Sequence, residues 1–444
     1  MSKSVLRDKS YAFDMKKIIL FILFFGSCSL LTIYCKGQNT ETIDSLKKVI
    51  PTMMEDTNKV NALNKLSELL NTKSYYKFSI PYTKEAYTLS NHLHFKKGIA
   101  VSNFNFGWSN ISNVGRRDVS EVLKTINEAK DYFNKADDAE HVGLCYAISA
   151  AEYYRIEQNY PDAIKNYFVA LKIFEKIDNK SKLANCYKDL SLVYMDQNDT
   201  TEALKYALLA YKSYEILKDS NRIAYQCNVI GMIYLAQNKN AEALDLILKG
   251  LKLYETLGTK GYWFGIPWTN GNVGDVYCKM GDDAFASGDT KLAKNRYDKA
   301  FEYYKNRYDY DSKNGNLGGP VNLQYGNLYS RLSTVVGADE KNEMLNKSKF
   351  YLQIALDSAR TKDNYYNIYK SMSDKDTLEG NFKMAYRHYF LAKLYLDSLI
   401  NDEKSKKSAM YKMQFETDKK EALEKAAQEA KDSRQRNIRN SIIV

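Results

Sequence analysis

The stretch AISAAEYYRIEQNYPDAIKNYFVALKIFE, residues 147–175, has two near-copies further along the chain. YKDLSLVYMDQNDTTEALKYALLAYKSYE covers residues 187–215, and CNVIGMIYLAQNKNAEALDLILKGLKLYE covers residues 227–255. The copies align without gaps, and each begins 40 residues after the one before. A Tyr, an Ala and a further small residue recur at fixed places: Tyr154, Ala163 and Ala170, then Tyr194, Ala203 and Ala210, then Tyr234, Ala243 and Gly250. A fixed period of this length indicates a repeat array.

Each copy contains two blocks in which apolar residues recur at steps of three and four residues. This spacing predicts two amphipathic helices per copy. The polar segments EQNYPD, DQNDT and AQNKNA separate the blocks and suit turns that start the second helix. One such hairpin cannot bury its own apolar side, whereas stacked hairpins bury a continuous core. The sequence therefore predicts an all-α solenoid.

The pattern resembles the tetratricopeptide repeat, which has an aromatic residue, Leu-Gly and a Tyr, and later an Ala, an aromatic residue and a third small residue. The clearest matches are Cys227, Ile230, Gly231, Tyr234, Ala243, Ile247 and Gly250. The usual proline after the second helix is absent, and the period exceeds the family's usual 34 residues. The resemblance implies a tetratricopeptide-like solenoid of stacked hairpins, with helices lengthened as in longer-period variants of the family.

The match is best over 137–257. Residues 38–136 look like degenerate repeats, and 258–400 look like irregular ones. NGNLGGP, at 314–320, is the clearest linker in the irregular part.

The N-terminal residues suit an export signal. Lys16 and Lys17 follow Met15 and precede an apolar stretch from Ile18 to Tyr34. These are the charged and apolar regions of a secretory signal, so we expect initiation at Met15 and removal of residues 1–37. An uncleaved anchor is the alternative, although the stretch is short for a membrane span. The expected location is extracytoplasmic, on the periplasmic side.

Four cysteines remain after residue 37: Cys145, Cys186, Cys227 and Cys278. None belongs to a CxxC pair, which argues against a zinc site. Small buried helix residues are one reading, and a disulfide in an oxidising compartment is the other.

The sequence offers little for catalysis. It has four histidines and no phosphate loop, nucleophile elbow or acid–base constellation. We therefore expect no enzyme activity, no cofactor and no metal. The net charge of +11 is spread along the chain, so no nucleic-acid partner is expected.

The resemblance places the first helix of each repeat on the concave side, where a protein or peptide partner would bind. Carried over residue by residue, it predicts a ligand groove lined by Asn185, Lys188, Leu192, Tyr225, Asn228, Met232, Trp268 and Asp275. These side chains suit a peptide or an extended polar ligand. The alternative is that they face solvent or a neighbouring helix.

KGYWFGIPWTNGN, at 260–272, interrupts the array. It carries two of the three tryptophans, and Pro267 predicts a helix that begins close to it. Its aromatic residues would either pack an irregular joint or contact a ligand.

Residues 401–440 are rich in Ala, Glu, Lys and Gln and contain no Pro or Gly, which predicts one long linker helix. A thin apolar stripe suits either a two-stranded coiled coil, and hence a homodimer, or a single solvated helix. The stripe consists of Met410, Met413, Leu423, Ala427 and Ala430.

The tail also resembles the junction in Bacteroidetes-type membrane histidine kinases and adenylate/guanylate cyclases. In that group an extracytoplasmic tetratricopeptide half precedes a linker helix, a membrane helix and an effector. Residues 441–444 would then begin a truncated transmembrane helix that anchors the protein. This layout implies a non-catalytic, peptide-binding sensor for signal transduction. The alternative is a stand-alone secreted or periplasmic scaffold for protein–protein interaction.

Overall fold

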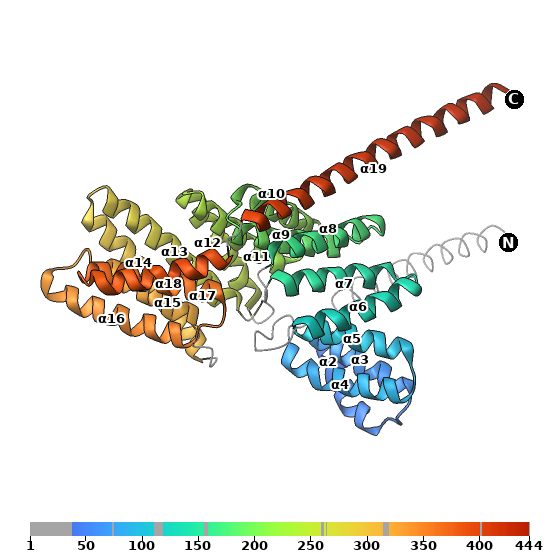
Figure 1. Ribbon diagram of the computed structural model, residues 1–444, viewed down its shortest axis with the longest axis horizontal. Coiled ribbons are helices and arrows are strands. Elements are labelled where there is room, and N and C mark those ends of the chain that lie inside the picture. Colours follow the sequence, from blue (N-terminus) through green and yellow to red (C-terminus); the bar gives the residue numbers. More distant parts are fainter. Residues whose placement is uncertain are drawn as a thin grey trace, which may run out of the picture. The chain divides into compact units, whose positions relative to one another are not determined.

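The computed structural model describes residues 38–72, 75–110, 119–154, 159–258, 262, 264–313, 319–399 and 402–443 (Figure 1). The predicted signal peptide, residues 1–37, lies outside this part of the chain, as does Val444. Within it every regular element is a helix, so the all-α prediction is confirmed. The chain forms two compact units that divide near residue 136, and each is described by itself.

Unit 1 consists of α2 (Gln38–Val49), the 3-10 helix η1 (Ile50–Thr52), α3 (Thr57–Thr72), α4 (Tyr76–His92), α5 (Lys96–Asn110) and α6 (Val119–Lys135). Helices α3 and α4 form a hairpin, and α5 packs against both. Small polar side chains let these helices approach closely. The buried hydroxyl of Ser79, for example, bonds Asn71 and Ser109 at 2.6 Å each. The interior of this unit is therefore partly polar but hydrogen-bonded, as buried polar groups must be.

Unit 2 begins at Asp137 and contains helices that pair as hairpins in chain order. The pairs are α7 (Ala139–Glu152) with α8 (Tyr160–Lys176), α9 (Lys180–Asp196) with α10 (Thr200–Ile216), α11 (Ser220–Ala236) with α12 (Asn240–Leu257), α13 (Gly265–Ala286) with α14 (Thr290–Lys313), α15 (Gly319–Leu332) with α16 (Ala338–Asp357), and α17 (Lys362–Leu378) with α18 (Phe382–Leu399). The long helix α19 (Asp402–Ile443) follows.

The 40-residue period arises from helix and turn lengths. Helices α9, α10 and α11 each have 17 residues, and three residues separate each from the next. In the turn after α9, Asn198 adopts a left-handed conformation with φ of 60°. Asp199 then caps α10, because its carboxylate accepts a hydrogen bond from the backbone N–H of Glu202 at 3.1 Å. Asn and Asp suit these two positions, which accounts for much of the polar turn segments, although Lys218 adopts the left-handed conformation and Lys239 the cap position in later turns.

Replacing Asp199 with Ala should remove this cap and cost about 1 kcal/mol of unfolding free energy. The measurement is the urea midpoint of the full chain, which should fall without a change in slope. Asp199→Asn is the control, because an amide oxygen can accept the same bond. An equal loss in both variants would contradict the capping role.

The core of unit 2 pairs large tyrosines with small residues. Tyr214, Tyr254, Tyr297 and Tyr304 are fully buried, as are the repeat alanines Ala203 and Ala243. The four cysteines are free and buried, so they are core residues in this structure rather than disulfides.

The first helices of successive hairpins lie against one another, as α9 does with α11, α11 with α13, α13 with α15 and α15 with α17. Successive second helices are further apart, since no such pair makes comparable contact in the described ranges. The array therefore curves toward the first helices, and these form its inner face.

No described helix combines the length and the apolar character that a bilayer crossing requires. Ser441, Ile442 and Ile443, where a membrane helix was expected to begin, continue the backbone of α19.

Candidate functional site

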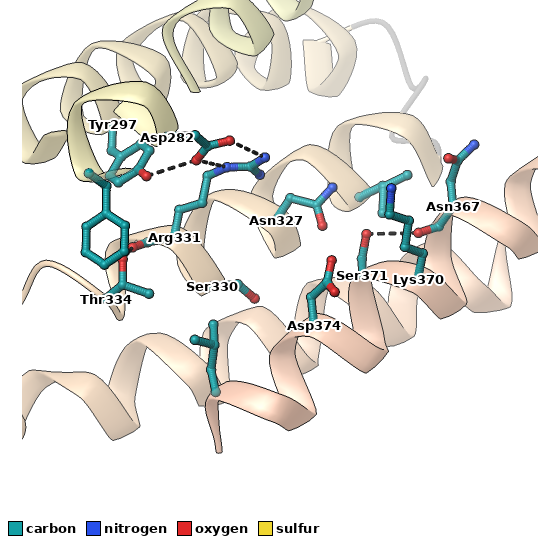
Figure 2. Close-up of a pocket in the computed structure, with 13 residues that line it drawn as sticks. Asp282, Tyr297, Asn327, Ser330, Arg331, Thr334, Asn367, Lys370, Ser371 and Asp374 are labelled. Atoms are coloured by element: carbon teal, nitrogen blue, oxygen red, sulfur yellow. Dashed lines mark hydrogen bonds and ion pairs between the residues drawn. The ribbon is translucent and has the colours of Figure 1, made fainter. Parts of the chain in front are cut away.

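A pocket of about 430 Å³ lies on the inner face of unit 2, between α13, α15 and α17 (Figure 2). Polar residues recur at helical steps of three and four along α15 and α17, so one side of each helix faces the pocket. The lining residues are Asp282, Phe285, Tyr297, Leu323, Asn327, Ser330, Arg331, Thr334, Asn367, Lys370, Ser371, Asp374 and Leu378.

One wall of the pocket is an ion pair between two first helices. Arg331 of α15 donates to both carboxylate oxygens of Asp282 of α13, from Nε at 2.8 Å and from Nη2 at 3.0 Å. The hydroxyl of Tyr297 donates to the same carboxylate at 2.9 Å. A bidentate pair of this kind holds both side chains in one geometry. This wall is therefore preformed.

The other side of the pocket carries uncommitted polar groups. The side chains of Asn327, Lys370 and Asp374 make no hydrogen bond or ion pair to another residue of the described ranges. Figure 2 shows Asn327 in view between the Asp282–Arg331 pair and the Lys370 and Asp374 side chains. Desolvation raises the pKa of the Asp374 carboxyl, and the charges of Lys370 and Arg331 oppose that shift. A donor, an acceptor and an amide are thus available to a ligand.

The groove predicted from the sequence lies upstream, on α9, α11 and α13. Lys188 Nζ sits 5.9 Å from the ring centroid of Tyr225, and this ring stacks on Trp268 with centroids 4.9 Å apart. Lys188 also pairs with Asp189. Burial alone would lower the pKa of Lys188, but the neighbouring Asp189 carboxylate raises it above its ordinary value. The structure therefore joins Lys188, Tyr225 and Trp268 into one row across three first helices.

Other predicted groove residues form hydrogen bonds with residues of the chain itself. Asn228 is fully buried, donates to the carbonyl of Ala224 and accepts from Asn272. Asn185 accepts a hydrogen bond from the hydroxyl of Tyr214 at 2.9 Å.

Asp275 accepts from the Tyr304 hydroxyl at 2.6 Å and from the Gln324 amide at 2.9 Å, while burial raises the pKa of its carboxyl. Leu192 and Met232 pack, half-buried, against two neighbouring core clusters. No ligand tests these eight positions, so the groove they define stays a prediction.

The interruption at 260–272 falls at the start of α13, which begins at Gly265, two residues before Pro267. Gly265 is required there because a Cβ atom would meet the ring of Tyr254 at 2.6 Å. Trp268 packs on Tyr225 and on Phe264, so it fills the joint between repeats. Its half-buried side chain still leaves part of the ring accessible.

The tail helix α19 packs on the outer side of the array, on α8. Phe415 is 7% exposed and stacks on Phe168 of α8, with ring centroids 4.3 Å apart and planes within 10°. Further along the tail, Leu423, Ala427 and Ala430 are exposed, as are Met410 and Met413. The predicted apolar stripe is therefore solvent-facing in this structure, and the docked side carries different residues.

Ion pairs surround the Phe415 contact. Lys412 bonds Glu202 at 2.8 Å, and Lys205 of α10 bonds Glu416 at 3.0 Å. Further pairs join Lys172 to Asp418 and Lys419 to Glu175. The hydrogen bond from Lys205 holds the pKa of Glu416 below its ordinary value. Exposed pairs contribute little singly, so the aromatic stack supplies most of the attachment and the charges fix its register.

Sequence reasoning missed both the pocket and the docked tail. The pocket lies where the repeat pattern is weakest, and only the helical spacing of 327, 331 and 334 and of 367, 370, 371 and 374 pointed to a shared face. Within the described residues, no cluster of three or more His, Cys, Asp or Glu side chains could hold a metal ion.

Comparison with known proteins identifies the fold alone. No protein-family model matches the sequence, and no curated protein sequence matches it. Among solved structures, the chain is similar to aspartyl phosphate phosphatase F from Bacillus subtilis, with 13% identity and a TM-score of 0.52 over 80% of this chain and 93% of that one. A Rap protein complexed with competence and sporulation factor gives 14% identity and a TM-score of 0.51 over 80% and 99% of the two chains. The Rap conjugation gene regulator of plasmid pLS20, in complex with the Phr* peptide, gives 10% identity and a TM-score of 0.51 over 82% and 96%.

Proposed function

We propose that the chain is a peptide-binding helical-repeat protein and that its ligand occupies the pocket between α13, α15 and α17. The observation that carries this proposal is the set of uncommitted polar groups, Asn327, Lys370 and Asp374, beside a preformed wall. A side-chain amide can donate to and accept from a peptide bond. One protein of similar fold was solved in complex with the Phr* peptide and another with competence and sporulation factor, which supports the class of ligand.

The charges of the pocket indicate which kind of peptide it would bind. Asp282 neutralises Arg331, which leaves Lys370 as the cation and Asp374 as the neighbouring acid open to ligand groups among the lining residues. A carboxylate bonded to an ammonium makes a charge-assisted hydrogen bond, which is stronger than a neutral one. Apolar side chains of Phe285, Leu323 and Leu378 line the same pocket. The preferred ligand is therefore a short peptide with an acidic side chain next to an apolar one.

The test uses capped hexapeptides that are identical except for Glu or Gln at one position, titrated calorimetrically into the full chain. We expect the Glu peptide to bind roughly tenfold more tightly, which corresponds to about 1.4 kcal/mol. Lys370→Met should abolish that preference, because it removes the ammonium and keeps the length of the side chain.

Lys349→Met is the matched control, since Lys349 is exposed on the second helix α16. It should leave the Glu preference unchanged. Failure of all peptides to bind, or an unchanged Glu preference in Lys370→Met, would contradict the proposed site.

The finer part of the proposal is that this solenoid is the exported sensor portion of a signal-transduction protein. The apolar segment 18–34 supports export, and the docked tail supports an output. Two residues, 400 and 401, separate α18 from α19, while α19 is fixed to α8 by Phe415. The tail therefore links the hairpin that lines the pocket to a hairpin several repeats away. A peptide that alters the curvature between them shifts the population of docked tail.

Export has its own test, since peptide binding does not require it. When the outer membrane is permeabilised and the inner membrane stays intact, added protease should cleave the tagged chain. The N-terminal sequence of the mature chain should begin near Gln38. A chain protected in the cytoplasm with residues 1–37 retained would contradict the sensor proposal and leave peptide binding standing.

A further inference from the structure

The last helix of the repeat array, α18, exposes an apolar face that no described element covers. Five large side chains project from it: Phe382 is 70% exposed, Tyr386 71%, and Tyr389, Phe390 and Leu394 57% each. They recur at steps of three and four residues, so they form one stripe along the helix. The opposite side of α18 packs on α17 through Ala385 and Ala392. We call the five exposed side chains the α18 stripe.

A repeat array needs a polar end or a cover on its last apolar face. Helix α19 follows in the chain and would be the natural cover, but it docks on α8 instead. The α18 stripe therefore remains unpartnered in the described chain. Monomeric proteins seldom expose apolar surface of this kind, and where they do it marks an interaction site.

Two pairs of exposed residues on α18 are placed symmetrically about Phe390, although Phe382 and Tyr389 of the stripe have Ser398 and Leu391 at the equivalent positions. Tyr386 and Leu394 lie four residues before and after it, and exposed Lys383 and Asp397 lie seven residues before and after it. Neither Lys383 nor Asp397 has an ion-pair partner among the described residues. Fourteen residues along a helix span about 21 Å, so the two cannot pair within one copy. In two antiparallel copies of α18 that cross at Phe390, each Lys383 faces an Asp397.

From this symmetry we infer that the α18 stripe is a dimer interface and that its partner is the same helix of a second copy of this chain. A two-fold axis through the Phe390 contact makes the interface self-complementary. The two phenylalanines meet at the centre, Tyr386 and Leu394 of each copy lie on either side, and the two Lys383–Asp397 pairs close the ends.

The remaining exposed cations do not oppose this arrangement. Arg387 and Lys393 occupy positions that the two-fold axis would bring to the same level. Six residues are about one and two-thirds helical turns, so the two side chains lie about 120° apart around the helix, on opposite flanks of the stripe. They therefore point away from each other across the interface. This dimer differs from the coiled coil that the tail sequence allows, because it uses no residue of α19.

Sedimentation equilibrium of the full chain tests the dimer and its register. The expected wild-type mass is about twice 51.2 kDa at micromolar concentrations. Phe390→Asp should give a monomer, while Leu423→Glu, in the exposed stripe of α19, should leave the dimer intact. Circular dichroism checks that each variant remains helical. Both positions are exposed, so the substitutions should not disturb the fold.

Charge reversal then tests the antiparallel register. Lys383→Glu and Asp397→Lys should each raise the dimer dissociation constant about three- to tenfold, and the double variant should restore it. A wild-type monomer, a Phe390→Asp dimer, or a double variant weaker than both single ones would overturn the inference. A monomer that sediments with phosphatidylglycerol vesicles but not with phosphatidylcholine vesicles would assign the stripe to an anionic membrane surface instead.

Discussion

Replacing Phe415 with Ala is expected to release the first part of α19 from the repeat array while unit 2 stays folded. The Phe415 ring is almost fully buried and stacks on Phe168. Removing a buried phenyl ring costs about 2–3 kcal/mol at a site that can partly relax. This should increase the undocked fraction roughly 30- to 150-fold. Amide hydrogen exchange of residues 408–419, followed by mass spectrometry, measures that fraction directly.

Met413→Ala is the matched control, because Met413 lies on the same helix and is 69% exposed. Its exchange should match that of the wild type. If Phe415→Ala exchanged no faster than this control, the aromatic stack would not be what holds the tail. If the whole of unit 2 exchanged faster, Phe415 would belong to the core rather than to a separable contact.

A second large effect is expected from Gly274→Ala in the middle of α13. A Cβ atom there would overlap the ring of Tyr304, which is fully buried and donates a 2.6 Å hydrogen bond to Asp275. The ring cannot move without breaking that bond and disturbing Cys278. Overpacking of this kind costs about 1–3 kcal/mol. Alanine has a better helix propensity than glycine, which stabilises the variant by about 1 kcal/mol. A net loss of stability would therefore show that the clash with Tyr304 outweighs this gain.

The measurement is the urea midpoint of unit 2, compared with that of Gly337→Ala. Nothing lies within 4 Å of a Cβ at Gly337, so this control involves no steric clash, and as the N-cap of α16 it should lose at most about 1 kcal/mol. Equal midpoints for the two variants would show that the Tyr304 ring has room to shift. The claim that close packing of α13 on α14 requires glycine at 274 would then be wrong.

The repeat array was predictable because its rules are local. The Asn198–Asp199 turn and the Tyr–Ala spacing occur within single hairpins, so the period and the helix pairs follow from three aligned segments. Local turn chemistry and helical periodicity decided these features. That the first helices form the inner face was implied only by the family resemblance. Tyr225 and Trp268 were expected on the same groove, but the stacking of these two rings, 43 residues apart, comes from the structure and not from the sequence.

The pocket and the docked tail depend on distant packing. Arg331 pairs with Asp282, which lies 49 residues earlier in the sequence, and Phe415 stacks on Phe168, which lies more than 240 residues earlier. In a single sequence each looks like an ordinary member of a charged or weakly apolar helix. Asn228 was predicted to line the groove, but its side chain is buried and hydrogen-bonded to Asn272. Side-chain partners of this kind are set by the curvature of the array, which one repeat does not encode.

We propose that peptide binding in the pocket loosens the tail. This coupling is tested by hydrogen exchange of residues 408–419 in the full chain, with and without a saturating concentration of the tightest Glu hexapeptide. Exchange there should be several-fold faster with peptide, approaching that of Phe415→Ala, while the pocket helices α15 and α17 become more protected. Protection of the pocket helices with unchanged exchange in 408–419 would contradict the coupling and leave a peptide-binding solenoid with a tail that does not respond to its ligand.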